Sequence, residues 1–385
     1  MPEDFIVEES ISLPLIKGKN GKYAIYKVIK KTIPTLEIQA ILSYALNIPQ
    51  SYIHFPALKD KHALIIQYVS IFRKFIPSFK NERFSLEYIG RSERKLLPQD
   101  LRGNIFTVTL RSLTQKTIEE IKKRLDEIEI FGFPNFFDTQ RFGSYSETAG
   151  FIGKKILLED FSGALETFFY LPLDNDSPQI RAFKLKAQGI KGKWRELFDR
   201  APRSTQRSIL AYLKDHPDDF RGAAKRINPR ILSIFLSAYQ SYLWNKIAAN
   251  YLKGVLKKKN IEINSIKILD THLPFYRNLP EEVLGEFSVK AIPLPSKKTE
   301  FLDEDIEKIF FEILNEESLK LRNLRVRFTD KVFLSHNTRK PIVIPGNIKT
   351  IKEDEDEMNS GKIKLVISFS LPPGSYATFL LKTLI

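Results

Sequence analysis

Residues 55–63 read FPALKDKHA, and residues 64–72 follow at once with LIIQYVSIF. The second part is rich in β-branched and aromatic residues, which predicts a buried strand. Just before this strand, Asp60 lies between Lys59 and Lys61. A carboxylate at the entrance of a strand, inside a basic frame, fits a chemical centre. Taken alone, the stretch fits an ordinary charged turn on a surface better, so the rest of the chain decides between the two interpretations.

The two lysines have a chemical purpose only in particular surroundings. A free aspartate has a pKa of about 3.9 and is already ionised at neutral pH. Burial can raise such a pKa by as much as about 3–5 pH units, because burial disfavours the charged form. Lys59 and Lys61 therefore matter if Asp60 is buried, where they would keep it ionised, or if they bind phosphates.

The predicted elements change in kind along the chain. Strands come first with a few helices, the middle is mostly helical, and strands return towards the end. The clearest predicted strands are residues 5–11, 23–31, 64–72, 105–110, 325–334, 341–344 and 362–371. The clearest predicted helices are residues 35–46, 117–131, 205–213, 231–258 and 301–316. This order predicts an α+β protein in which an inserted helical domain interrupts a discontinuous domain.

The chain is strongly basic, and the excess charge is concentrated. Its 385 residues carry a formal net charge of +15. Residues 181–230 contain 14 Lys and Arg against 5 Asp and Glu, which gives +9 in 50 residues. Arginines interleaved with aromatic residues such as Trp194 and Phe198 suit a surface that follows a phosphate backbone. A polyanionic partner is therefore expected. An anionic membrane is disfavoured, because no basic amphipathic helix is recognisable.

The composition excludes several kinds of chemistry. The chain has no Cys, which excludes disulfides, thiolate catalysis and cysteine-ligated zinc. Its five His do not have metal-ligand spacing, and no phosphate-binding glycine motif is present, so we expect no cofactor and no metal. The acidic run of residues 353–357 is interpreted as a solvated loop. The acidic amino-terminal residues and the polar interruptions of residues 231–244 predict a cytoplasmic protein that does not enter a membrane.

The densest aromatic signal is residues 135–143, which read NFFDTQRFG. Three phenylalanines lie close to amide and guanidinium donors, directly after a predicted helix ends at Gly132. An exposed loop of this kind suits a base that has been pulled out of its stack. A hydrophobic loop packed into the core has the same residue types, and both interpretations stay open. Phe369 belongs to the apolar face of the last predicted strand, so core packing is its leading interpretation.

Together these stretches resemble the TruD family of tRNA pseudouridine synthases, in particular its archaeal and eukaryotic branch. The resemblance covers the whole chain, and its motifs occur in order. They are Pro2–Glu9 (PEDFIVEE), Lys59–Ala63 (KDKHA) with Gln67, Gly103–Asn104 with Phe106 and Arg111, Asn135–Gly143, Leu236–Asn245 (LSAYQSYLWN) and Leu371–Thr378 (LPPGSYAT). One short motif would not be specific, whereas an ordered series across the chain is.

The resemblance implies a fold and a division into domains. Residues 1–160 and 325–385 would form a discontinuous pseudouridine-synthase catalytic domain, built on a mixed sheet. Residues 161–324 would form an inserted, mainly helical TRUD domain. The basic segment of residues 181–230 falls inside this insertion, which fits a role in holding tRNA.

The resemblance also implies an activity and the residues that carry it. The protein would be an isomerase that converts one uridine of tRNA to pseudouridine without a cofactor, at position 13 or, as in the archaeal and eukaryotic branch, at position 35. Asp60 would be the catalytic aspartate, acting either as a nucleophile or as a base. The residues implied to bind RNA and the target base are Lys59, Lys61, Asn135, Phe137, Gln140, Arg141 and Phe369. The expected partner is tRNA, with no protein partner and a monomeric enzyme. A non-catalytic RNA-binding protein or RNA chaperone on the same scaffold is the alternative.

Overall fold

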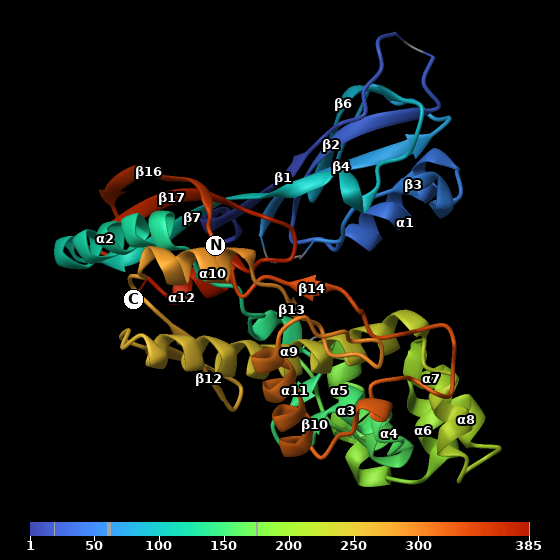
Figure 1. Ribbon diagram of the computed structural model, residues 1–385. Helices are drawn as coiled ribbons and strands as arrows, with labels where there is room; N and C mark the ends of the chain where they lie inside the picture. The colour runs from blue at the N-terminus through green and yellow to red at the C-terminus, as the bar shows by residue number, and fades with distance from the viewer. Residues whose placement is uncertain (19, 60–62, 175, 385) are drawn as a thin grey trace. The chain divides into compact units, whose positions relative to one another are not determined.

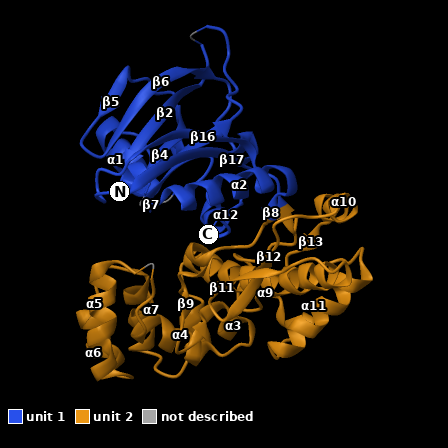
Figure 2. Ribbon diagram, turned by 90° about the vertical axis from the view of Figure 1, so that its left-hand side faces the viewer, with its two compact units in different colours: residues 1–133, 343–385 blue, residues 134–342 orange. Residues whose placement is uncertain are grey.

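The chain folds into two compact units (Figure 2). Unit 1 consists of residues 1–133 and 343–385, and unit 2 consists of residues 134–342. The computed structural model describes residues 1–18, 20–59, 63–174 and 176–384. The elements of these ranges form a mixed sheet and a set of helices, so the predicted α+β class is confirmed.

The two compact units do not have the bounds of the predicted domains. By their contacts, residues 134–160 and 325–342 belong to unit 2. The prediction placed both segments in the catalytic domain. A compact unit and a catalytic domain are different divisions of a chain, so the assignment of residues 161–324 as the inserted domain stays a prediction.

Unit 1 is built on one mixed sheet (Figure 1). Among the described residues the sheet has nine strands, which are β1 (Phe5–Ile11), β2 (Tyr23–Lys31), β3 (Ile53–His54), β4 (Leu64–Phe72), β5 (Ser78–Lys80), β6 (Phe84–Ser92), β7 (Leu101–Leu113), β16 (Gly346–Glu355) and β17 (Ile363–Leu371). Their order is β16-β17-β7-β1-β4-β2-β6-β5, with β3 paired to β4. Strands β1 and β4 are parallel, and the other neighbouring strands are antiparallel. The last strands of the chain join β7, so the sheet combines both ends of the sequence.

Helices pack against this sheet. The described helices of unit 1 are α1 (Thr35–Leu46), α2 (Gln115–Phe131) and α12 (Ala377–Lys382). On α1, the fully buried Ile38 and Leu42 belong to one apolar cluster with Val28 of β2 and Val69 of β4. Helix α2 begins at its cap Thr114, whose side chain accepts the amide of Thr117, and it lies beside β16 (Figure 1). The apolar stripe of α1 thus fixes the helix over β2 and β4.

An ion cluster with one buried carboxylate ties the amino terminus of unit 1 to its last hairpin. Arg111 on β7 donates hydrogen bonds to Asp4 (2.8 and 3.1 Å), Asp356 (2.9 Å) and Glu357 (3.1 Å). Asp356 also accepts a backbone amide of β7 at 2.8 Å, and its side chain is fully buried. The prediction of a solvated loop at residues 353–357 is therefore wrong in its loop and at Asp356, while Glu353, Glu355 and Glu357 are exposed as expected. The run begins inside β16, and Asp356 is buried because an arginine and backbone amides supply its partners.

Unit 2 is mainly helical and is organised around one long helix. The described helices are α3 (Ile152–Leu157), α4 (Phe161–Tyr170), α5 (Pro178–Ala187), α6 (Trp194–Arg200), α7 (Thr205–Leu213), α8 (Phe220–Ala224), α9 (Pro229–Lys258), α10 (Glu281–Val289) and α11 (Glu304–Glu316). Along the 30 residues of α9, side chains such as Leu243, Trp244 and Ile247 are fully buried. A helix that is apolar on most sides is buried by its neighbours. No helix in the described part of the chain is long and apolar enough to cross a membrane.

Short strand pairs complete unit 2. They are β9 (Tyr145–Ser146) with β10 (Gly150–Phe151), β11 (Asn264–Ile268) with β12 (Thr271–Phe275), and β13 (Ile292–Pro293) with β14 (Thr338–Arg339). One further pair, β8 (Phe133–Pro134) with β15 (Ile342–Val343), lies where the chain passes from one unit to the other.

Residues 325–334 form no strand, so this prediction is wrong. Val326, Phe328, Val332 and Leu334 are buried while most of the residues between them are exposed, which is the alternation that suggested a strand. Among the strands of the described residues, none pairs with the segment. Alternating burial records that one side of a segment packs against the protein, and it does not require a partner strand.

Replacing Asp356 by Asn tests the ion cluster of unit 1. Although burial opposes them, hydrogen bonds from backbone amides, Asn359 and Arg111 hold the pKa of Asp356 well below its ordinary range. A lowered pKa stabilises the fold above the ordinary value, and this contribution is lost as the pH falls through the folded-state value. We therefore expect D356N to lower the free energy of unfolding at pH 7 and to remove part of its decline below about pH 4.

Chemical denaturation at a series of pH values measures both effects. The control is D354N, because Asp354 lies on the same hairpin, pairs with Lys352 at 2.5 Å and has a side chain that is 42% exposed. Equal losses in D356N and D354N would contradict the role given to Asp356.

Candidate active site

The main chain and the side chain of Lys59 are both fixed in unit 1. Its backbone amide donates to Oγ1 of Thr35, the first residue of α1, at 3.2 Å. Its Nζ donates to Oδ1 of Asn104 on β7 at 2.5 Å and lies 3.4 Å from Oε1 of Glu9 on β1. The side chain of Lys59 is 13% exposed and that of Glu9 is fully buried. Three elements of unit 1 therefore hold the residue that directly precedes Asp60.

Two predicted site residues, Asp60 and Lys61, lie outside the described residues. The structure defines the chain on both sides of them. On one side Lys59 is held by its three partners, and on the other β4 begins at Leu64. The predicted burial of β4 is confirmed for one face of the strand, where Ile65, Val69 and Ile71 are buried, while Ile66 and Tyr68 on the other face are half-buried.

A buried lysine contacts the same segment. Lys30 on β2 is 1% exposed, and its Nζ donates to the carbonyl oxygens of Ile33 (2.8 Å) and Lys59 (3.1 Å). Burial of an ammonium group is costly unless it is hydrogen-bonded, so these contacts hold the Lys59 carbonyl at Lys30. The sequence analysis missed Lys30. Its burial was predictable, because Ala24, Val28 and Lys30 are an even number of residues apart and side chains two apart in a strand share a face.

Glu9 belongs to a group of buried polar side chains on the sheet. It is opposite Asn104 in the β1–β7 register, and its Oε2 accepts the amide of Tyr68 on β4 at 2.9 Å. Burial raises the pKa of Glu9, although the charge of Lys59 and the Tyr68 amide oppose this. Within the described ranges, Nε2 of Gln67 is buried and has no hydrogen-bond partner, whereas Oε1 of Glu9 is buried with the ammonium group of Lys59 3.4 Å away. A buried polar atom without a partner is rare in folded proteins, so Gln67 marks a place where water or a polar ligand would bind.

Phe369 lies on the same face of the sheet. Its register partner is Phe106, which in turn is opposite Val7, two residues before Glu9 on β1. Directly opposed residues, and residues two apart in a strand, share a face. Phe369 is fully buried, and its ring stacks on Phe106 with centroids 5.5 Å apart and planes at 24°. Phe369 is therefore packed in the core and also lies on the face of the sheet that carries Glu9. Its contact with a base stays a prediction.

In unit 2, an arginine far away in sequence fixes Asn135. Arg339 donates to the backbone oxygen of Asn135 (2.8 Å) and to its Oδ1 (2.6 Å). The Nδ2 of Asn135 donates to the carbonyl of Lys340 at 3.1 Å, and its backbone amide donates to Pro341 at 2.8 Å. Asn135 is 5% exposed. Its polar atoms thus hold the start of the aromatic loop in place.

Phe137 is packed rather than exposed. Asn245 on α9 accepts the Phe137 amide (2.9 Å) and donates to its carbonyl (2.8 Å). The ring is 7% exposed, meets Trp244 edge-on at 5.6 Å, and has the guanidinium of Arg339 4.2 Å from its centroid. Of the two interpretations left open by the sequence, the packed loop describes this arrangement. The implied stacking of Phe137 on uracil stays a prediction.

The other two predicted residues of this loop differ in their exposure. Gln140 is exposed. Arg141 is half-buried, donates from Nε to Oγ of Ser241 at 3.0 Å, and has its guanidinium 5.5 Å from the Phe137 ring. The structure therefore brings Asn135, Phe137 and Arg141 together within unit 2, as it brings Lys59 together with Glu9 within unit 1.

The residues that anchor the aromatic loop had unequal signals in the sequence. Trp244 and Asn245 belong to the LSAYQSYLWN motif, whose positions suggested importance but no role. Arg339 gave no signal, because it lies 204 residues from Asn135. No group of three or more His, Asp or Glu side chains in the described ranges could hold a metal ion.

Comparisons with known proteins extend over the whole chain. The family model described as tRNA pseudouridine synthase D (TruD) matches residues 1–384. A protein of Methanocaldococcus jannaschii, described as a probable tRNA pseudouridine synthase D 2, is 33% identical over 387 residues, which are 99% of this chain and 89% of that protein. The tRNA pseudouridine synthase D of Aquifex aeolicus is 27% identical over 100% of this chain and 96% of its own.

A solved structure shares the fold. It is the crystal structure of a Methanosarcina mazei protein described as a tRNA pseudouridine synthase D (TruD), with a TM-score of 0.70 and 27% identity. The match covers 99% of this chain and 91% of that one. The similarity therefore concerns both compact units and not a single motif.

Replacing Asn245 by Ala tests the anchoring of the aromatic loop. The change removes both hydrogen bonds to the Phe137 main chain and leaves a buried amide and a buried carbonyl without partners. Each such group costs about 1–3 kcal/mol, so we expect N245A to lower the free energy of unfolding by at least that amount. Urea denaturation measures the loss. Asn250 is exposed on the same helix, and N250A serves as the control. A loss in N245A no larger than in N250A would show that the loop is held by other contacts.

Proposed function

We propose that this protein isomerises uridine to pseudouridine in tRNA, because the chain belongs to the tRNA pseudouridine synthase D (TruD) family. The observation that carries the proposal is the family match over residues 1–384. A match of this extent includes the Lys59–Ala63 stretch, the aromatic loop of residues 135–143 and the long helix α9. The enzyme is then an isomerase whose substrate and product have the same atoms.

The chemistry of the reaction fits the residues that the chain offers. The N1–C1′ bond of the target uridine breaks, the base turns, and C5 joins C1′. The proton on C5 is lost and N1 gains one, so no electrons are exchanged with a cofactor. A carboxylate is needed that either adds to the nucleoside or removes a proton from the sugar. We assign this role to Asp60, and both routes are compatible with its neighbours.

The contacts of Lys59, the residue that directly precedes Asp60, support this assignment. An aspartate that works in a water-poor site needs a cation nearby to stay ionised. Lys59 is the adjacent residue, and its ammonium group is fixed by Glu9 and Asn104. Lys30 holds the Lys59 carbonyl, so the chain enters the Asp60 position from a rigid anchor. Lys59 is thus proposed to anchor the chain next to Asp60 and to supply the cation that keeps Asp60 ionised. Lys61 is proposed to supply a second cation or to bind a phosphate.

The proposed base-binding residues of unit 2 have a different basis. Phe137 offers a ring for stacking, while Asn135, Gln140 and Arg141 offer amide and guanidinium donors. Two of these are already engaged by residues outside the loop, because Asn135 pairs with Arg339 and Arg141 with Ser241. Contact of Phe137 with a uracil would therefore require Arg339 or Arg141 to share the ring face or to turn away. Phe369 of unit 1 is proposed to contact the target base as well.

The finer points of the function are part of the same proposal. The substrate is tRNA, the target is the uridine at position 13 or at position 35, and the enzyme works as a monomer in the cytoplasm. Mapping of pseudouridine in treated tRNA would identify the position.

The reaction is tested with tRNA that carries tritium at C5 of uracil. Formation of the C5–C1′ bond releases this tritium to water. We expect the wild-type protein to release it and D60N to bind the same tRNA but to release it at least about 10³-fold more slowly, because an amide can neither attack nor accept a proton. Full release by D60N would remove Asp60 from the mechanism. Binding without any release by the wild type would instead identify a non-catalytic RNA-binding protein.

Replacing Lys59 by Met tests the role of its charge. Loss of a nearby cation favours protonation of a carboxylate, so we expect the acid limb of the pH–rate profile to move to higher pH, by up to about one to two pH units. Tritium release measured between pH 5 and pH 9 gives the profile. The exposed Lys80 of the same unit provides the control K80M. An unchanged acid limb in K59M with a normal fold would contradict an electrostatic role for Lys59.

A further inference from the structure

The loop of unit 2 that was expected to be a strand is a second concentration of positive charge. Residues 320–340 contain seven Lys and Arg and one Asp, which gives +6 in 21 residues. The basic segment noted in the sequence, residues 181–230, ends about 90 residues earlier. We call residues 325–336 the pocket segment, because they form much of the wall of a pocket.

The pocket segment is held in place although it belongs to no sheet. Nε2 of Gln240 on α9 donates to the carbonyl oxygens of Ser335 (2.6 Å) and Pro295 (2.9 Å). The backbone amide of Leu294 donates to the carbonyl of Asn337 at 2.9 Å. Gln240 is 4% exposed. One buried amide therefore joins the pocket segment to residues near Pro295, and the pocket between them is preformed.

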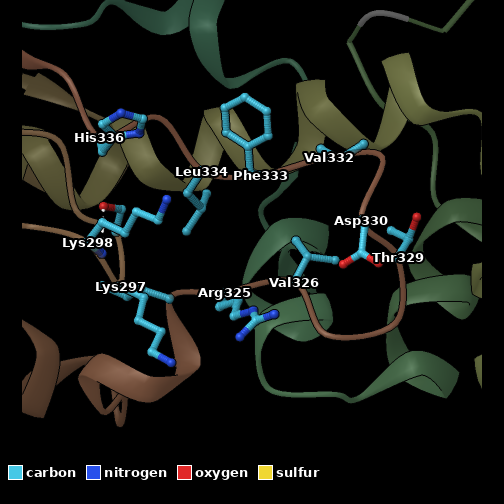
Figure 3. A pocket seen from close by; sticks show the side chains of 12 residues that line it. Lys297, Lys298, Arg325, Val326, Thr329, Asp330, Val332, Phe333, Leu334 and His336 are labelled. Carbon is cyan, nitrogen blue, oxygen red and sulfur yellow. Dashed lines mark hydrogen bonds between the residues drawn. The ribbon is translucent and has the colours of Figure 1, made fainter.

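The pocket combines an apolar wall with basic side chains (Figure 3). It has a volume of about 540 Å³, which falls in the range of about 300–1,000 Å³ that is common for sites of small molecules. Val326, Val332 and Leu334 supply apolar surface. In Figure 3 the side chain of Lys298 reaches towards Leu334, whereas that of Lys297 extends the other way. The pocket thus offers an apolar surface beside a cation.

The cations of this pocket are available to a ligand. In the described part of the chain, Lys297, Lys298 and Arg325 form no ion pair, and all three are exposed. By contrast, Arg327 lies 3.6 Å from Glu159, and Arg339 is occupied by Asn135. Unpaired cations grouped beside an apolar surface attract an anion that has an apolar part.

An exposed aromatic ring completes the site. Phe333 is 75% exposed, and it lies at the edge of the pocket with His336 nearby (Figure 3). A single exposed ring is common on protein surfaces, so its meaning here comes from its place beside the apolar wall and the unpaired cations of the pocket. Aromatic rings beside Lys and Arg are the common means by which proteins bind single-stranded nucleic acids, because each base can stack and each phosphate can pair.

The positive surface continues beyond this pocket. A neighbouring pocket of about 470 Å³ shares Thr329 and Val332 with the first and is also lined by Lys225, Arg226 and Lys331. Two segments of unit 2 that are about 100 residues apart thus meet at the pocket segment. A chain of phosphates could follow the pocket segment from one pocket to the other.

We infer that the pocket segment binds unpaired nucleotides of an RNA chain. One base packs on the apolar wall, a neighbouring base stacks on Phe333, and the phosphates pair with Lys298 and Arg325. A duplex would not fit as well, because its bases are not free to enter a pocket or to stack on a side chain. That this RNA is the tRNA substrate rests on the proposed function, whereas binding of single-stranded RNA does not.

The inference is tested first by binding, without reference to catalysis. The probes are a labelled single-stranded oligouridylate and an RNA duplex of equal length. The first variant is K298A/R325A, and its control K257A/K308A removes the same charge from exposed residues of unit 2. The second variant is F333A, and its control Y44A removes a 91% exposed aromatic side chain of unit 1. We expect K298A/R325A to weaken binding of the single strand at least about tenfold more than its control. The slope of the logarithm of its binding constant against the logarithm of the salt concentration should become shallower by about 1.4, which is about 0.7 for each lost phosphate contact.

F333A is expected to weaken binding of the single strand by about 5- to 150-fold through loss of stacking, without changing the salt dependence. Site variants that bind the single strand no more weakly than their controls would overturn the inference. A wild-type protein that prefers the duplex would overturn it too.

Tritium release from tRNA then separates this inference from the proposed function. The site variants should raise KM and leave kcat close to that of the wild type, because the pocket binds RNA and does not touch the reacting uridine. If the wild type binds single strands through the pocket segment but releases no tritium, the proposed function fails and the binding site stands. If kcat falls with KM unchanged, the residues act elsewhere than in binding and the inference fails.

Discussion

The ion pair between Lys59 and the buried Glu9 is the contact on which unit 1 depends for its proposed chemistry. Glu9 lies on β1, and the carboxylate would be unfavourable there without a cation, because burial alone raises its pKa. Lys59 supplies that cation and is at the same time held to β7 through Asn104 and to α1 through Thr35. Removal of one partner from such a buried pair costs on the order of 3–5 kcal/mol in well-studied proteins. A surface turn would not be anchored in this way, and this is the physical reason to regard the stretch before β4 as a site.

In unit 2 the corresponding constraint is the burial of α9. Its motif residues face the aromatic loop: Asn245 holds the main chain of Phe137 and Trp244 packs against the ring. Arg339, close to the end of unit 2 in sequence, bonds to Asn135 and lies over the Phe137 ring. The same helix fixes the pocket segment through Gln240. One buried helix thus determines the position of the predicted base-binding loop and of the proposed RNA-binding surface.

The sequence predicted much of this by periodicity. Alternation located β1, β2, β4 and β17, and the apolar stripe of α1 located that helix. It failed at residues 325–334, because buried alternation does not reveal whether a partner strand exists. It also failed at Asp356, whose partners Arg111 and a β7 amide are about 245 residues away. For the site, the ordered motifs pointed to Lys59 and Phe137, but Lys30 and Arg339 became recognisable only through contacts between distant segments.

The central claim is that this chain makes pseudouridine and that Asp60 is required. The most direct measurement is the mapping of pseudouridine, at single-nucleotide resolution, in unmodified tRNA transcripts incubated with the wild-type protein and with D60N. The account predicts that a single uridine is converted by the wild type, that the same uridine is untouched by D60N, and that both proteins bind the transcript with similar affinity. Conversion by D60N at the wild-type rate, or no pseudouridine in any transcript treated with the folded wild-type protein, would contradict it.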